Sequence, residues 1–502
     1  MSKAMEPNSK SRKESILIKY ATFSRLLVLF LTLMWRSFLQ PYDTSAALNP
    51  PCLHHRDEVV AEDSPPPLLL ANSSVSRTLE NSVVWDSVYF LRITECGGYE
   101  YEQTYAFLPL LPFFISLLSR TVFAPLVPLI GLRAVMVLSG YVVTNVAFVF
   151  AALYLFRVSV IILKDTEASF RASLIFCFNP ASIFYSSIYS ESLYALFSIG
   201  GVYHLLSGTS NVAVLWFALS GCARSNGILN AGYICFQTMH RAYEAFSLKR
   251  RLCLSVQVFV TGFIRCVCIC LPFVAFQAYG YYNICHGHKL DELRPWCKGK
   301  VPLLYNFIQS HYWGVGFLRY FQFKQLPNFL LASPILSLAL CSIVSYVKTR
   351  PELFLSLGFQ ATEKEKRSSA RLYSLKDVLE PDVIITSSNE GNRDIRQRKL
   401  SRKKDVTVTD TAAESNSSSG YFSADVFPFV VHLGLMAATA FFIMHVQVAT
   451  RFLSASPPLY WFASHLIASP KHNSKWGYLI WSYCAAYILL GSLLFSNFYP
   501  FT

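Results

Sequence analysis

Charged residues are scarce in this 502-residue sequence, in which Asp, Glu, Lys and Arg together make up 15%. A soluble domain usually carries about 25% charged residues, so the composition excludes an ordinary soluble protein. Hydrophobic residues make up 53% of the chain, and forty Phe and twenty-eight Tyr are among its residues. This balance is typical of a protein with much lipid-facing surface and with aromatic side chains at the membrane interfaces. We therefore predict an all-α polytopic membrane protein.

Metal-binding motifs are absent as well, because the thirteen cysteines form no CxxC pair and no Cys/His spacing typical of a metal site. Most of them lie in apolar runs, where cysteine serves as a small hydrophobic residue. Four others lie in polar stretches and can form disulfides, in a pairing left open, if these stretches face an oxidising lumen: Cys52, Cys96, Cys285 and Cys297. No cofactor or metal is predicted, although the sequence leaves open whether a divalent ion assists.

The formal charge of +14 is gathered in a few short tracts rather than in a stripe suited to a nucleic-acid groove. These tracts lie at the N-terminus, from His240 to Arg251 and from Arg393 to Lys404. Short cationic tracts beside apolar segments are typical of the cytosolic loops of membrane proteins. We expect a membrane protein without a nucleic-acid partner.

Ten apolar segments are long enough to cross a bilayer core of about 30 Å, which needs roughly 20 helical residues. They are residues 21–39, 106–130, 133–163, 168–187, 190–207, 212–236, 252–282, 326–347, 425–443 and 475–497. The first is too long for a signal-peptide core and lacks a good cleavage site, so we interpret it as a retained signal anchor. The boundaries allow between eight and twelve spans.

With residues 1–20 in the cytosol and ten membrane crossings, three basic parts of the chain lie on the cytosolic side. They are Arg133, the 240–251 loop and the 348–424 segment. The same alternation predicts lumenal loops at 40–105, 164–167, 283–325 and 444–474, the first with a glycosylation sequon at Asn72. Residues 348–424 are rich in Ser, Lys, Glu and Asp and poor in aromatics, which indicates a mostly disordered insertion. This insertion separates a core at 21–347 from a C-terminal membrane part at 425–502.

Asp86 stands out after the first span, because Trp85-Asp86 lies between apolar and aromatic residues. A carboxylate in such a place, facing a cavity, can accept a proton from an attacking hydroxyl. Asp also favours helix starts, so from the local sequence alone a helix cap is the more favoured interpretation. Glu102 follows in a second aromatic stretch, Tyr99 to Tyr105.

Two further ionisable residues lie in apolar surroundings, where a charge needs a reason. Glu191 follows a break at Asn179-Pro180, and the alternatives are a carboxylate facing a wet cavity and a solvated Glu in a short cytosolic turn. The predicted alternation places Glu191 on the cytosolic side of the membrane, opposite the lumenal loop that holds Asp86. Arg224 lies inside a span and either binds a phosphate or forms a structural pair with a Glu.

Two more candidate binding sites combine aromatic residues with polar groups. One lies around Trp313, and the other is the stretch that holds His445, Gln447 and Arg451. Such platforms suit a sugar or a lipid phosphate. An interfacial aromatic belt would look the same at any single position.

Taken in order, these stretches resemble a known family, the GPI mannosyltransferase 2 family of glycosylphosphatidylinositol (GPI) anchor assembly. The matching motifs are Trp85-Asp86, Gly98 to Glu102, Phe107-Leu108-Pro109, Asn179-Pro180-Ala181, Tyr189-Ser190-Glu191, Arg224 to Gly227, Pro302 to Tyr305, Tyr312 to Phe317, Gln325 to Leu330, His445-Val446-Gln447, Thr450-Arg451-Phe452 and Pro458 to Trp461. The resemblance covers nearly the whole chain except residues 1–15 and the stretch around 360–420.

The resemblance implies an enzyme of the endoplasmic reticulum membrane with the GT-C glycosyltransferase architecture and a lumenal active site. It implies two lipid substrates, dolichyl-phosphate-mannose as donor and the GPI precursor as acceptor of an α1,6-linked second mannose. A β-linked donor and an α-linked product need one inverting displacement, hence a base and polar groups for the leaving phosphate. The absence of a Ser/His or Cys/His nucleophile arrangement agrees with that mechanism. The need for a small accessory membrane subunit is left open.

On this resemblance, Asp86 is the expected base, since a first lumenal loop often carries the catalytic acid of GT-C enzymes. The other expected substrate-binding residues are Trp85, Glu102, Glu191, Arg224, Trp313, His445, Gln447 and Arg451. Two alternatives are another GT-C enzyme with the same donor and a lipid or solute transporter built from broken helices. Transporters often contain repeated halves, and we find no internal repeat in this sequence.

Overall fold

The computed structural model describes residues 7–40, 42, 52, 74–248, 250–287, 293–374, 420–469, 473–499 and 501. The regular elements of these residues are helices, with no strand among them, which confirms the predicted all-α fold. The first half holds α1 (Pro7–Phe38), α2 (Ser74–Asn81), α3 (Asp86–Cys96), α4 (Leu110–Arg120), α5 (Val127–Ile130), α6 (Leu132–Leu163), α7 (Thr166–Cys177), α8 (Ser182–Ser186), α9 (Glu191–Leu206), α10 (Ser210–Ala223) and α11 (Ala231–Tyr243). The second half holds α12 (Leu252–Cys285), α13 (Leu304–Tyr312), α14 (Leu326–Thr349), α15 (Pro351–Leu355), α16 (Glu363–Ser368), α17 (Ala370–Tyr373), α19 (Phe427–Phe442), α20 (Ala449–Leu453), α21 (Pro457–Ala468) and α22 (Asn473–Ser496).

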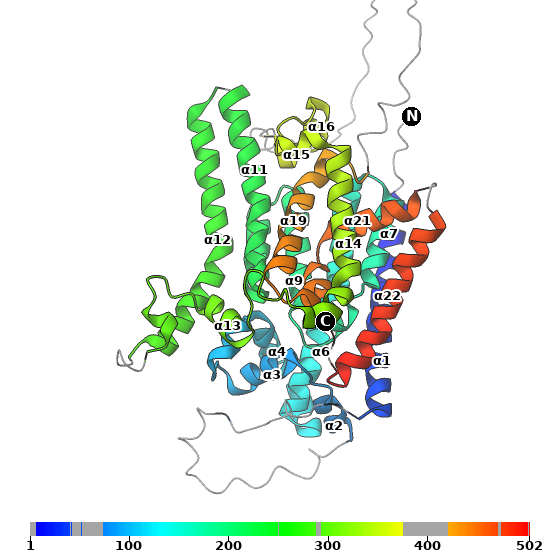
Figure 1. The fold of residues 1–502 in the computed structure, drawn as a ribbon, viewed down its shortest axis with the longest axis vertical. Coiled ribbons are helices and arrows are strands. Elements are labelled where there is room, and N and C mark those ends of the chain that lie inside the picture. The colour runs from blue at the N-terminus through cyan, green and yellow to red at the C-terminus, as the bar shows by residue number, and fades with distance from the viewer. Residues whose placement is uncertain are drawn as a thin grey trace, which may run out of the picture.

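The longer helices run between two ends of the molecule (Figure 1). We call the upper end in that view, with α15 and α16, the insertion end, and the lower end, with α2, α3 and α13, the pocket end. Six of the described helices are long and apolar enough to cross a membrane: α1, α6, α12, α14, α19 and α22. The protein is therefore a multi-pass membrane protein.

The predicted span 106–130 is a bent pair of helices, α4 and α5, whose axes differ by 65°. Ser76 in α2 donates a hydrogen bond to the carbonyl of Ile130 at 2.9 Å, and Arg133 pairs with Glu95 of α3 at 2.7 Å. Both contacts hold the end of the α4–α5 pair at the pocket end of the molecule. The pair also begins at the pocket end. The pair thus favours a re-entrant path, and the predicted placement of Arg133 on the side opposite the 40–105 stretch is wrong.

Ion pairs also correct the predicted lumenal turn at 164–167. Lys164 pairs with Asp425 at 2.8 Å, and Glu167 pairs with Lys13 of the N-terminal helix. Residues on opposite sides of a bilayer cannot form such pairs, so this turn lies at the insertion end. The chain then descends through α7 and α8 and returns through α9, which places Glu191 at the pocket end and not on the opposite side.

Two other predicted segments fold differently from a single span or a loop. The 212–236 segment is divided between α10 and α11, and both outer ends of this pair meet Arg371 at the insertion end. Arg371 donates to the carbonyl of Leu206 just before α10, and its carbonyl accepts from Gln237 of α11. The predicted loop 444–474 contains the buried helix α21, in which Ser464 donates to the carbonyl of Ala168.

Arg25 of α1 explains how the broken helix α7–α8 is tolerated inside the bundle. The break at Asn179-Pro180 leaves backbone carbonyls without their helical donors. The fully buried Arg25 guanidinium donates to the carbonyls of Cys177 at 3.2 Å and Ser182 at 2.9 Å, and it lies 3.8 Å from the centre of the Phe148 ring. Irregular backbone at membrane depth persists only where such partners exist.

Replacing Arg25 with Met is expected to destabilise the protein by about 2–4 kcal/mol, because two buried carbonyls lose their donors. The measurement is thermal unfolding of the purified protein in detergent. Lys19→Met, an exposed change on the same helix, serves as the control and is expected to change the midpoint little. An unchanged midpoint in Arg25→Met would contradict this role for Arg25.

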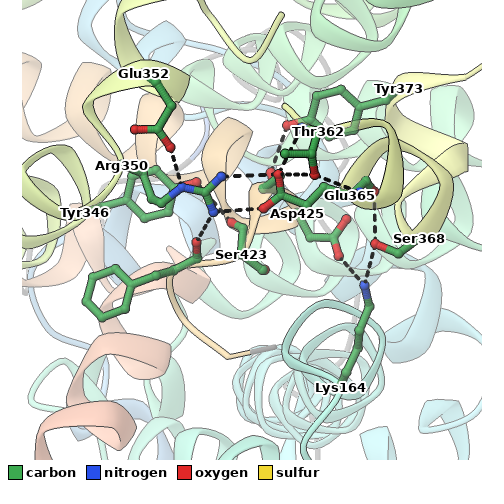
Figure 2. A network of polar contacts seen from close by, with 12 residues as sticks. Lys164, Tyr346, Arg350, Glu352, Thr362, Glu365, Ser368, Tyr373, Ser423 and Asp425 are labelled. Carbon is green, nitrogen blue, oxygen red and sulfur yellow. Dashed lines mark hydrogen bonds and ion pairs between the residues drawn. The ribbon is translucent and has the colours of Figure 1, made fainter. Parts of the chain in front are cut away.

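The two flanks of the predicted insertion are folded together at the insertion end (Figure 2). Arg350 donates to Glu365 at 2.9 Å and to the carbonyl of Phe422 at 3.0 Å, and Tyr373 donates to the carbonyl of Ala424 at 2.8 Å. Glu365 also completes a capping box with Thr362 at the start of α16. Part of the segment predicted as disordered is therefore ordered, while residues 375–419 and the sequon at Asn72 lie outside the described residues.

Candidate active site

A cavity of about 190 Å³ lies at the pocket end, where segments far apart in the sequence meet. The start of α3, the turn before α9, the end of α10, the α13 region and the start of α20 all contribute to it. Six of the nine predicted site residues line this cavity: Asp86, Glu191, Arg224, Trp313, His445 and Arg451. Trp85, Glu102 and Gln447 lie outside it.

Asp86 is the first residue of α3, and the helix start is shaped by the residue before it. Trp85 has a φ of 53°, an unusual value for a non-glycine residue, and its indole nitrogen donates to the carbonyl of Phe495 at 3.0 Å. The backbone N–H of Asp86 donates to the hydroxyl of Tyr189 at 3.1 Å. Trp85 therefore contributes by orienting the next residue rather than by lining the cavity.

The carboxylate of Asp86 pairs with Arg451 rather than capping its helix. The distance from Oδ2 to Nη1 of Arg451 is 2.9 Å, and no side-chain capping bond is formed at the start of α3. The Asp86 side chain keeps 34% exposure. A partly open carboxylate at a helix N-terminus, aimed into a cavity, has the geometry required of a base.

Two guanidinium groups and two carboxylates form one chain across the cavity. Glu191, only 2% exposed, pairs with Arg224 through Oε1, and the same oxygen lies 3.9 Å from Nη1 of Arg451. The interpretation of Glu191 as a solvated residue in a turn is therefore wrong, and the Arg–Glu pair weighed for Arg224 is present. In the described part of the chain, Oε2 of Glu191 and Nε of Arg451 are buried without a hydrogen-bond partner. Such orphaned polar groups are rare and point to a missing water or ligand.

Aromatic residues close another side of the cavity. Trp313 lies with its ring edge-on to Phe107, at 6.3 Å between ring centres, and both line the cavity. A ring nitrogen of His445 lies 2.6 Å from the carbonyl of Trp313, so His445 holds the Trp313 backbone in place. Gln447 does not line the cavity, and its side-chain oxygen is buried without a hydrogen-bond partner among the described residues.

Glu102 acts outside the cavity as an acceptor that joins its own segment to the loop with Arg294 and Trp296 and to the end of α13. It accepts hydrogen bonds from Arg294 at 3.1 Å, from the indole of Trp296 at 2.7 Å and from the hydroxyl of Tyr312 at 2.7 Å. Burial alone would raise the pKa of Glu102, but these hydrogen bonds outweigh burial and lower the pKa. Trp296 is adjacent in sequence to Cys297, and Tyr312 is adjacent to Trp313.

Both disulfides in the described residues lie at the pocket end. Cys52 is joined to Cys96 at the end of α3, and Cys285 is joined to Cys297 in the loop that carries Arg294. Cys52, Cys96 and Glu100 are close enough together to suggest metal ligands. Because the two sulfurs are bonded to each other and Glu100 pairs with Arg92, this group does not form a thiolate site.

Five polar residues of the cavity were not among the predicted site residues: Tyr189, Ser190, Ser225, Tyr305 and Gln309. Ser225 donates to the Tyr305 hydroxyl at 2.8 Å across 80 residues of sequence. Four of the five lie in the family-like motifs, at Tyr189-Ser190-Glu191, Arg224 to Gly227 and Pro302 to Tyr305. These four could have been found by asking which hydroxyl groups accompany the charged residues.

Comparisons with known proteins agree on one family. A family model described as "Mannosyltransferase (PIG-V)" matches residues 12–502. A human protein named "GPI alpha-1,6-mannosyltransferase 2" is 30% identical over 92% of this chain and 85% of its own length. A Drosophila pseudoobscura protein named "GPI mannosyltransferase 2" is also 30% identical, over 96% of this chain and 99% of its own length. No solved structure matches the chain significantly.

Proposed function

The chain belongs to the PIG-V mannosyltransferase family, and on that premise we propose that it adds the second mannose, α1,6-linked, to the GPI anchor precursor. It is a multi-pass membrane glycosyltransferase, so a transporter is no longer a competing interpretation. The proposed donor is dolichyl-phosphate-mannose, whose phosphate fits a cavity lined by two arginines. The pairing of a partly exposed Asp86 with Arg451 inside this cavity is the observation that carries the proposal.

The proposed reaction is a single displacement at the anomeric carbon of mannose. The acceptor hydroxyl oxygen forms the new bond, and the bond from the anomeric carbon to the phosphate oxygen breaks. Asp86 takes the hydroxyl proton, and dolichyl phosphate leaves with the bonding electron pair. One inversion converts the β-linked donor into an α-linked product, so no covalent intermediate is needed.

Arg451 and Arg224 are the groups proposed to stabilise the charge that develops on the leaving phosphate. A guanidinium binds phosphate oxygens with two parallel hydrogen bonds, and burial strengthens the interaction. Arg451 offers Nε, which has no protein partner in the described chain, and Glu191 holds both guanidinium groups toward the same cavity. Trp313 offers an aromatic face for a sugar.

We propose that the pocket end faces the lumen of the endoplasmic reticulum. The Cys52–Cys96 and Cys285–Cys297 disulfides support this orientation, because disulfides persist in an oxidising compartment. The basic 240–251 loop lies at the insertion end with the start of α1, as the positive-inside rule requires of a cytosolic side. The accessory membrane subunit stays a prediction.

Cells that lack this protein are expected to accumulate a GPI precursor with a single mannose, since the second transfer would be blocked. The measurement is metabolic labelling with mannose followed by chromatography of the lipid-linked glycans. Re-expression of the wild type is expected to restore the two-mannose product. Accumulation of a truncated N-glycan precursor with normal GPI precursors would instead identify a different acceptor and would refute the proposal.

A further inference from the structure

A second cavity, of about 460 Å³, lies near the insertion end between α10, α11 and α12. Its lining contains the start of α10 and one face each of α11 and α12, and it includes Asn211, Thr238, Gln257, Thr261, Gly262 and Arg265. The catalytic cavity touches the other end of α10, at Ala223 and Arg224. Because α10 has 14 residues, the two cavities lie about 20 Å apart.

The side of α12 that lines this cavity carries a stripe of polar residues, whereas the rest of the helix faces lipid. Gln257, Thr261 and Arg265 follow one another at four-residue intervals, which places them on one face of the helix. Their neighbours Phe259 and Phe263 are both 62% exposed, as expected on the lipid-facing side of the helix. Polar residues in a membrane-spanning helix are costly and usually functional.

Arg265 differs from the arginines of the catalytic cavity because the described part of the chain offers it no carboxylate. Nη2 of Arg265 donates to the side-chain oxygen of Asn211 at 3.2 Å, and Arg265 forms no ion pair with any described residue. Arg224 and Arg451, in contrast, each pair with an acid. The described lining of the second cavity contains no Asp or Glu, so the Arg265 guanidinium gives it a positive charge.

Close packing fixes the inner end of this cavity. A Cβ atom on Gly262 would lie 2.1 Å from the hydroxyl oxygen of Thr238. The α12 backbone at Gly262 therefore packs directly against the Thr238 side chain of α11. Gln257 and Thr261 are exposed at the outer side, so the cavity opens between the helices. The positive end of the α10 dipole adds to the field of Arg265.

We propose that this cavity binds the phosphate-bearing headgroup of an anionic membrane lipid. The Arg265 guanidinium pairs with the phosphate, while Asn211, Gln257 and Thr261 supply hydrogen bonds to phosphate or headgroup oxygens. The acyl chains lie against the exposed aromatic face of α12 at Phe259 and Phe263. A lipid suits the site better than a soluble anion because the cavity is lined by α12, which is long enough to span a membrane and carries exposed Phe259 and Phe263 beside the polar stripe.

The test is binding of dioleoyl phosphatidic acid to the purified full-length protein in detergent, measured by native mass spectrometry across a lipid titration. Dioleoylglycerol, with the same chains and no phosphate, is expected to bind at least tenfold more weakly. Arg265→Gln is expected to raise the Kd for phosphatidic acid about tenfold, the effect of one lost charge-assisted contact. Arg251→Gln removes the same charge from an exposed residue just before α12 and is expected to change the Kd less than twofold.

Three results would overturn the proposal: equal affinity in Arg265→Gln and the wild type, equal binding of dioleoylglycerol, or inorganic phosphate binding as tightly as the lipid. The last result would identify a free anion as the ligand. If Arg265→Gln does not fold, Gln257→Leu and Thr261→Val change exposed positions of the same stripe and are expected to raise the Kd about threefold. An unchanged Kd in both variants would equally refute the site. None of these measurements depends on mannosyl transfer, so they are independent of the proposed catalytic function.

Discussion

Replacing Asp86 with asparagine is expected to lower the rate of mannosyl transfer by about 100- to 10,000-fold, the contribution of a well-placed general base. Asparagine has nearly the shape of aspartate and its side-chain oxygen still accepts a hydrogen bond from Arg451. It cannot take the proton of the acceptor hydroxyl. The measurement is transfer of labelled mannose from dolichyl-phosphate-mannose to a one-mannose GPI precursor in membranes that contain equal amounts of each variant.

The control for Asp86→Asn is Glu95→Gln, which neutralises another acid of the same helix. Glu95 pairs with Arg133 outside the cavity that Asp86 lines, with 32% of its side chain exposed. A pair of this kind contributes little to stability, so near-normal activity is expected. Asp86→Glu keeps a carboxylate but moves it by one methylene, and an intermediate rate is expected. If Asp86→Asn keeps more than about a tenth of the wild-type rate, Asp86 is not the base.

The sequence could place the main members of the candidate site but not their pairing. Asp86 and Arg451 are 365 residues apart and both were predicted, each from its own surroundings. That Arg451 binds Asp86, and that Glu191 lies between two arginines, depends on how four separate segments pack. No local pattern contains that information.

The predicted membrane path failed where helices are broken. A rule that counts about twenty apolar residues as one crossing cannot distinguish a straight helix from α7–α8 or from the α10–α11 pair. Pro180 marked the first break in the sequence, whereas Arg224, at the second break, was predicted inside a span, and the direction of the chain depends on contacts such as Lys164 with Asp425. Arg25 was missed although a lone arginine in an apolar segment is a warning sign.

Glu191→Gln is expected to be the most damaging single change among the paired residues of the cavity. Glu191 is 2% exposed and is the carboxylate that Arg224 pairs with among the described residues, so its loss leaves a guanidinium without a counter-charge. Removing one partner of such a buried pair costs about 3–5 kcal/mol. A fall in the thermal midpoint together with loss of mannosyl transfer is expected. Glu14→Gln, which disrupts the more exposed pair with Arg157, is the matched control and is expected to shift the midpoint little.

The double variant Glu191→Gln with Arg224→Gln separates a structural pair from a phosphate contact. Removing both charges leaves no unpaired ion, so most of the lost stability is expected to return. Activity is expected to stay about 100-fold or more below the wild type, because the leaving phosphate still lacks the Arg224 guanidinium. The double-mutant cycle is read from two measurements on the same preparations, the thermal midpoint and the transfer rate. Recovery of both would mean that Arg224 serves only to neutralise Glu191, and the phosphate would then depend on Arg451 alone.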